Sequence, residues 1–177
     1  HYTFPAEGKF AAPVFARRVY TAFLKRLQAE GTLCFSAFAT IHKESTWQLM
    51  ELAETMGFKA YIGKVNMDRN APDYLLEDTD RSLADTEELA VRCRAAFPST
   101  TEKLMTGLGR LCETYDLPVQ SHLSENRNEV AWVKELHPDL PSYTAVYDTF
   151  GLLRPEKTIM AHAIYLSDEE KRLLRDK

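Results

Sequence analysis

Hydrophobic residues along the chain alternate between helical and strand spacing. Between residues 11 and 30 the apolar positions recur every three or four residues, which predicts a helix. The β-branched and aromatic run at 32–41 predicts a buried strand. A second helical pattern at 44–56 leads into a second predicted strand at 59–67. Strand, helix and strand in this order predict a βαβ unit with two parallel strands.

The second half of the chain repeats the alternation after a polar segment, 68–84, that is predicted to be a loop. Two further strands are predicted at 118–122 and 157–163. The remaining predicted helices carry an apolar stripe, and they begin at 85, at 100 or 101, at 126, at 143 and after Ser167. Glu170 follows Ser167 by three residues, a spacing that is typical of a capping box. The whole pattern predicts an α/β protein.

One strand of this series is missing from the sequence. A strand–helix unit takes about thirty residues, and the interval between the strands that begin near 59 and 118 is long enough for two units. That interval holds two helices joined only by residues 97–100, which are too few for a strand and its turns. We therefore predict that a strand is absent between 95 and 100.

The composition excludes several classes of protein. A chain of 177 residues, 45% of them hydrophobic, is long enough for one globular domain or a part of a larger one, and it is not intrinsically disordered. The net charge of −4 gives no basic excess for nucleic acid, and no apolar stretch is long enough to cross a bilayer. Three widely spaced cysteines form no paired motif, which fits a reducing cytoplasm.

Two polar features are expected at the surface. His137, which precedes a proline, is predicted to lie on a surface loop. The charged run from 169 to 177 is predicted to be the solvated face of a helix. The chain begins with histidine and stops within this charged helix, so we expect it to be part of a longer protein.

Histidines end two neighbouring predicted strands. His122 ends one strand, His162 lies near the end of the next, and Glu125 follows His122 by three residues. Carboxyl ends of adjacent parallel strands meet at one edge of a sheet, and neutral imidazole is a favoured zinc ligand. The pair therefore indicates either a metal site or two structural histidines bonded to backbone. Glu125 is a candidate proton carrier in the first case and a solvated surface residue in the second.

Longer motifs resolve this choice by their resemblance to a known family. The motifs are GKVNMDRNAPDYL at 63–75, QSHLSENRNEVAWV at 120–133, YTAVYDTFGLL at 143–153 and KTIMAHAIYLS at 157–167. Together with YTFPAEGKFA near the start and FATIH at 38–42, they closely resemble the guanine deaminases of the amidohydrolase superfamily. The resemblance implies a partial, distorted (β/α)8 TIM barrel. Residues 1–177 are then the central part of the catalytic barrel.

The resemblance also implies the chemistry. It implies hydrolysis of guanine to xanthine and ammonia with one Zn²⁺ per chain. His122 and His162 match the family's metal ligands, and Glu125 matches the carboxylic acid that carries protons to the purine ring and the departing amine. The expected partner is this small-molecule purine, with no nucleic acid and no membrane, and we expect a homodimer in the cytoplasm.

The family pattern is incomplete in this chain. The family's His-x-His pair on the first strand belongs ahead of residue 1, and its ligating aspartate on the last strand belongs beyond Lys177. The Arg-Phe pair that grips guanine belongs on the missing strand, so the substrate-binding residues stay unassigned. We expect the 177-residue chain alone to hold zinc weakly and to deaminate nothing. Two alternatives remain open, namely another amidohydrolase that acts on a related heterocycle and a truncated paralogue without catalytic activity.

Overall fold

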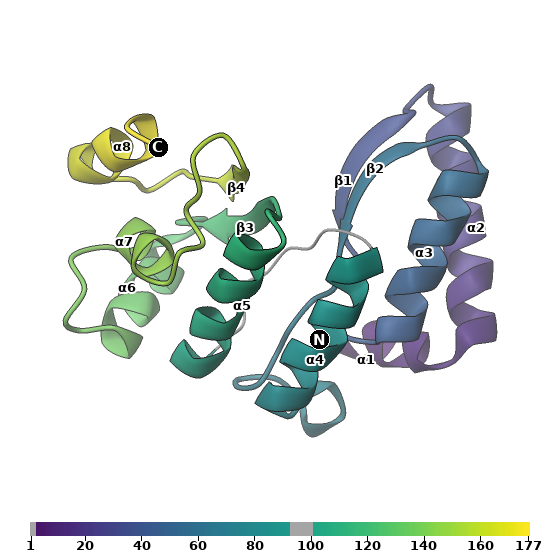
Figure 1. The fold of residues 1–177 in the computed structure, drawn as a ribbon, viewed down its shortest axis with the longest axis horizontal. Coiled ribbons are helices and arrows are strands. Elements are labelled where there is room, and N and C mark those ends of the chain that lie inside the picture. The colour runs from purple at the N-terminus through teal and green to yellow at the C-terminus, as the bar shows by residue number, and fades with distance from the viewer. Residues whose placement is uncertain (1–2, 93–100) are drawn as a thin grey trace. The chain divides into compact units, whose positions relative to one another are not determined.

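The computed structural model describes residues 3–92 and 101–177, which belong to two compact units (Figure 1). The first unit spans His1–Thr101 and the second unit spans Glu102–Lys177. The strand predicted to be missing between 95 and 100 lies outside the described residues.

The first unit is built around the predicted βαβ unit. Strand β1 (Cys34–Phe38) pairs in parallel with β2 (Lys59–Gly63), and the two are connected through helix α3 (Lys43–Thr55). This confirms the predicted order and direction of the two strands. The other elements of the unit are α1 (Thr3–Glu7), the 3-10 turn η1 (Gly8–Ala11), α2 (Pro13–Ala29), the 3-10 turn η2 (Asp73–Leu75) and α4 (Thr79–Arg92).

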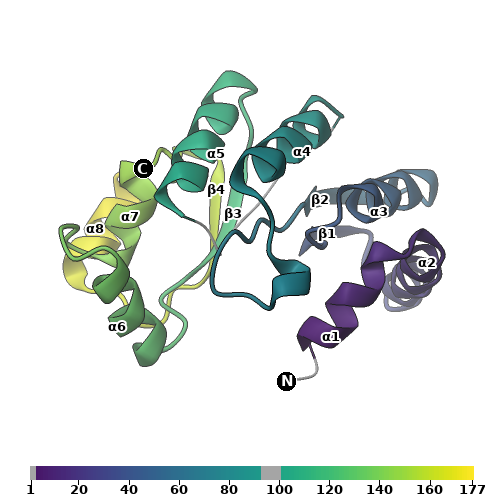
Figure 2. The same ribbon diagram turned by 90° about the horizontal axis from the view of Figure 1, so that it is seen from below.

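Helices α2 and α3 lie side by side and cover one face of the β1–β2 pair (Figures 1 and 2). Leu24 on α2 and Leu49 on α3 are buried in this layer together with Ile62 of β2. Each such side chain contributes about 1.5–3 kcal/mol when it is removed from water. The rings of Phe35 and Phe58 meet edge to face at 5.5 Å within the same core cluster.

The loop predicted at 68–84 is shorter than expected, because α4 begins at Thr79. The carboxylate of Asp78 accepts the backbone N–H of Arg81, which satisfies one of the free donors of the first turn. Ser82 belongs to the polar segment and Thr86 follows it on α4, and both side chains are buried. Their hydroxyls donate to Asn66 instead of facing water, so a polar sequence here does not mean an exposed loop.

Lys64, immediately after β2, is the centre of this buried polar cluster. Its side chain is completely buried, and Nζ donates to Glu77 Oε1, to Asn66 Oδ1 at 3.2 Å and to the Val65 carbonyl at 3.0 Å. Burial lowers the pKa of Lys64, and the neighbouring Glu77 carboxylate opposes that shift. Because Glu77 Oε2 also accepts the Met67 N–H, the ion pair ties the segment after β2 to the start of α4.

The second unit contains the other predicted strand pair. Strand β3 (Val119–Leu123) pairs in parallel with β4 (Thr158–His162), and Figure 2 shows the two side by side. The helices are α5 (Glu102–Thr114), α6 (Arg127–Leu136), α7 (Tyr143–Thr149) and α8 (Asp168–Arg175), close to their predicted ranges. The two described strand pairs confirm the α/β class with parallel strands.

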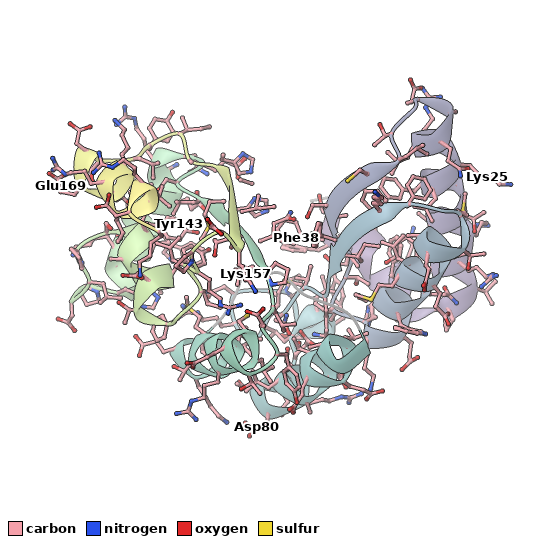
Figure 3. The ribbon with its side chains drawn as sticks, turned by 45° about the horizontal axis from the view of Figure 1, so that its top comes forward. Lys25, Phe38, Asp80, Tyr143, Lys157 and Glu169 are labelled. Atoms are coloured by element: carbon pink, nitrogen blue, oxygen red, sulfur yellow. The ribbon has the colours of Figure 1, made fainter. Side chains whose placement is uncertain are left out.

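One surface prediction in this unit is wrong, and a second holds except at one residue. His137 is buried, with 6% of its surface exposed, because the chain beyond α6 folds back and its ring meets Phe150 edge to face. Within the charged run, Glu169 points outward as expected (Figure 3), whereas Glu170 is buried. Glu170 closes the predicted capping box with Ser167 and also accepts two hydrogen bonds from Thr144 on α7.

Helix α5 packs directly against the end of α7. A Cβ atom placed on Gly109 would lie 1.9 Å from the carbonyl oxygen of Phe150, so only glycine allows this approach. Cys112 on the same helix is buried, and burial raises the pKa of its thiol to about 11. Cys34 is exposed, and Cys93 lies outside the described residues.

We predict that Gly109→Ala destabilises the protein by about 1–3 kcal/mol, the usual cost of overpacking. Helix propensity alone predicts the opposite sign, a gain of about 1 kcal/mol. Urea denaturation measures the difference, with Thr106→Ala on the exposed side of α5 as the control. An unchanged or higher stability for Gly109→Ala would contradict the close approach.

We predict that Lys64→Met costs about 3–5 kcal/mol of stability, because it leaves the Glu77 carboxylate partly buried without its cation. The double variant Lys64→Met/Glu77→Gln should recover part of this loss. Lys43→Met is the control, since Lys43 also pairs with carboxylates but keeps 23% of its side chain exposed. Equal losses for the two single variants in urea denaturation would contradict a special role for the buried pair.

Candidate metal centre

His122 is placed by the pleat of β3. Ser121 is completely buried and its hydroxyl meets Tyr147 on α7, so this face of the strand packs on the helices. Val119 and Leu123 share that face, because side chains alternate along a strand, and both are buried. His122 therefore projects from the opposite face, and it is only half-buried.

His162 reaches the same place through an unusual backbone conformation. In the β3–β4 register it lies opposite Leu123, so a regular strand would put its side chain on the buried face. Its φ angle is +68°, in the left-handed region that costs a residue with a side chain about 1 kcal/mol or more. The Ala163 N–H donates to the Leu123 carbonyl at 2.8 Å and holds this turn. The turn redirects the His162 ring toward His122.

Glu125 completes the group. Ser124, with φ of +50°, turns the chain out of β3, and Glu125 follows directly. Its Oε2 lies 3.6 Å from His162 Nε2, and that nitrogen lies 3.0 Å from His122 Nδ1. One donor atom from each of the three residues falls within 4.8 Å of the others. The structure thus brings together all three residues singled out in the sequence.

The donor set fits a zinc ion. Imidazole nitrogen is a zinc ligand, and two nitrogens about 2.0–2.1 Å from a tetrahedral ion lie about 3.3 Å apart. The 3.0 Å between the two histidine nitrogens is close to that separation. The side chains of His162 and Glu125 are 32% and 49% exposed, so a metal ion and a small molecule can both reach the group.

Residues that support the group were missed by the sequence analysis. Glu129 Oε2 accepts the backbone N–H groups of Glu125 and Asn126, and Asn126 caps α6 in return, which makes a capping box. The Asn-x-x-Glu spacing was a usable signal for it. Tyr143, labelled in Figure 3, and Tyr147 contact this region from α7. No local sequence pattern indicates such long-range contacts. Burial raises the pKa of both tyrosines, so both hydroxyls stay protonated at neutral pH.

No helix within 3–92 or 101–177 is long and apolar enough to cross a membrane.

Comparison with known proteins gives consistent relatives. The chain is similar to the guanine deaminase of Dictyostelium discoideum, with 43% identity over 98% of this chain and 41% of that protein. The crystal structure of guanine deaminase from C. acetobutylicum with bound guanine in the active site matches with a TM-score of 0.95 and 44% identity, over 99% of this chain and 45% of that one. The E. coli guanine deaminase structure matches with a TM-score of 0.94 and 35% identity, over 98% and 44%.

The chain spans about two fifths of the length of the curated relatives that it matches. The sequence pattern of the amidohydrolase family matches residues 8–177, which is nearly the whole chain. Members of this family are generally metal-dependent, usually on zinc, and the group of His122, Glu125 and His162 agrees with that. The chain belongs to the amidohydrolase family.

Proposed function

We propose that residues 1–177 are the central part of a zinc-dependent guanine deaminase that hydrolyses guanine to xanthine and ammonia. The observation that carries the proposal is the convergence of His122, Glu125 and His162 at the ends of two parallel strands. The relatives described above are guanine deaminases, and one of them holds guanine in its active site. Guanine is accordingly the proposed substrate.

His122 and His162 are the proposed ligands of one zinc ion per chain. Their ring nitrogens already face each other, so binding an ion between them needs little rearrangement. Bound zinc lowers the pKa of a water ligand to about 7 and so supplies a nucleophile at neutral pH. Two histidines leave positions for that water and for ligands from other parts of the protein, because catalytic zinc sites use about three protein ligands.

Glu125 is the proposed proton carrier. Hydrolysis at a ring carbon needs a proton on the ring nitrogen and a second on the departing amine, and a positioned carboxyl group can deliver both. Glu125 lies beside the histidines yet keeps half of its side chain exposed, which leaves its carboxylate room to reach a substrate. Its backbone N–H is fixed by Glu129, so its position does not depend on metal coordination.

The proposal extends to the fold, the oligomeric state and the cellular location of the whole protein. We place the two strand pairs in a distorted (β/α)8 barrel, whose sites form at the carboxyl ends of parallel strands. A homodimer is the proposed assembly, because twofold dimers are the commonest soluble oligomers. The cytoplasm is the proposed location, which the unpaired cysteines Cys34 and Cys112 support.

The proton carrier is tested in a chimera that replaces the matching segment of the C. acetobutylicum guanine deaminase by residues 102–177 of this chain. We predict that the chimera releases ammonia from guanine and that Glu125→Gln lowers kcat by about 10²- to 10⁴-fold, the usual contribution of a general acid–base group. Zinc content should stay near that of the parent chimera, because Glu125 is not a ligand. Glu135→Gln on the exposed side of α6 is the matched control. Loss of zinc in Glu125→Gln, or full activity, would contradict the assignment.

The metal ligands are tested in the 177-residue chain itself by equilibrium dialysis against Zn²⁺. We expect measurable uptake that is abolished in both His122→Asn and His162→Asn, since each variant removes one of two facing nitrogens. His42→Asn carries the same substitution at a histidine that is not a proposed ligand and should bind as the parent chain does. Zinc uptake that survives in either site variant would show that the ion is held elsewhere.

A further inference from the structure

Two tyrosines on α7 contact the candidate metal centre from its buried side. Tyr147 is 4% exposed, and its hydroxyl donates to the backbone carbonyl of His122 at 3.0 Å. Tyr143 lies one helical turn earlier (Figure 3), and its hydroxyl donates to Glu129 Oε1 at 3.1 Å. One short helix thus contacts both the metal-ligand side and the proton-carrier side of the centre.

The Tyr147 hydroxyl fixes the end of β3. It has one proton, which it gives to the His122 carbonyl, and it lies 2.7 Å from Ser121 Oγ, whose proton it can accept. The two contacts hold consecutive residues of the strand. Because a carbonyl that is held at one position limits rotation of its own peptide, the His122 side chain keeps its direction out of the opposite face.

The Tyr143 hydroxyl fixes Glu125 through Glu129. The two oxygens of the Glu129 carboxylate have different tasks, since Oε2 accepts the Glu125 N–H at 2.8 Å and Oε1 accepts from Tyr143. Without Tyr143 the carboxylate keeps the bond to Glu125 but loses the contact that holds its own rotamer. The order of the capping box next to the proton carrier therefore depends on Tyr143.

The rings of the two tyrosines pack against each other. Their rings stack with centroids 5.6 Å apart and planes 19° from parallel. The start of α7 is held by Ser142, which accepts the Ala145 N–H, and by the buried Glu170 carboxylate, which accepts from the N–H and hydroxyl of Thr144. Because the two rings pack against each other, we expect each tyrosine to restrict the rotamers of the other.

We propose that Tyr147 and Tyr143 are positioning residues of the metal centre, with Tyr147 holding the ligand His122 and Tyr143 holding the proton carrier Glu125 through Glu129. This assignment rests on the proposed function for the roles of His122 and Glu125. Neither tyrosine touches the reacting atoms in this scheme. Each acts through the residue that it orients.

The proposed role of Tyr143 is tested by amide hydrogen exchange of the full 177-residue chain, measured by NMR. Tyr143→Phe should speed exchange of the Glu125 N–H by roughly 2- to 10-fold, which corresponds to the net contribution of one hydrogen bond. The Ser167 N–H is the internal control, because it donates to Glu170 in a second capping box of the same unit. Equal acceleration at both amides would mean general loosening and would overturn the assignment, as would no change at Glu125.

The proposed role of Tyr147 is tested by titrating the full chain with Co²⁺. The visible absorption of the bound Co²⁺ is recorded, because it reports the geometry of the ligands. Tyr147→Phe should weaken Co²⁺ binding by about 10-fold, the lower end for loss of a group that orients a metal ligand, and should change the shape of the band. Tyr20→Phe is the matched control, because Tyr20 is also buried and its hydroxyl has no hydrogen-bond partner among the described residues.

An unchanged affinity and band in Tyr147→Phe would overturn its role, and so would an equal effect of Tyr20→Phe. A parent chain that takes up no Co²⁺ would overturn the metal site itself and with it the role of Tyr147. Exchange of the Glu125 amide does not require a metal, so it would still decide the role of Tyr143. The failure of the proposed function and the failure of the positioning scheme are therefore distinguishable.

Discussion

The parallel pairing of β3 and β4 is the constraint on which the candidate centre depends. Parallel strands end at the same edge of a sheet. Strand pairing therefore brings residues that are far apart in the sequence to one place, and their own side-chain contacts are not needed for this. The pairing is held by burial of the opposite face, where Leu123 and Ser121 pack on the helices. A shift of one residue in β3 would exchange its two faces and send His122 into the helical layer. Packing of one face of β3 against the helices thus determines which residues the other face presents to the candidate metal centre.

The ends of β2 and β3 both carry groups that can bear charge, but the two ends differ in what those groups contact. After β2, Lys64 is completely buried, and its ammonium finds a carboxylate, an amide oxygen and a carbonyl. A cation with its hydrogen bonds satisfied inside the protein has little left to offer a substrate. After β3, the donors of His122, His162 and Glu125 face one another at an exposed edge. The group after β3 therefore differs from Lys64 in that solvent can reach its side chains.

Periodicity in the sequence was enough to predict the described helices other than α1, although α4 begins earlier than predicted. It also predicted the four described strands and the arrival of two histidines at strand ends. It worked because burial of one face imposes a repeat that the residues themselves display. It was wrong where burial involved polar residues, as for Ser82 in the predicted loop and for His137. Their contacts with Asn66 and Phe150 lie more than ten residues away in the sequence. It was silent on Tyr143 and Tyr147, because their role depends on which helix covers which strand. The backbone turn at His162 has no signature in the residue types around it.

The turn at His162 holds this residue in an unfavourable backbone conformation. Glycine adopts a φ of +68° without strain, whereas histidine adopts it at a cost in free energy. Glycine would therefore suit the backbone at this position, but only histidine supplies the imidazole that the proposed metal site needs. A library of variants at this position that is screened only for thermal resistance would enrich glycine or asparagine and lose the imidazole. Retention of histidine among variants would therefore report selection for ligand binding rather than for folding. Consensus or stability-driven redesign of this protein should hold position 162 fixed.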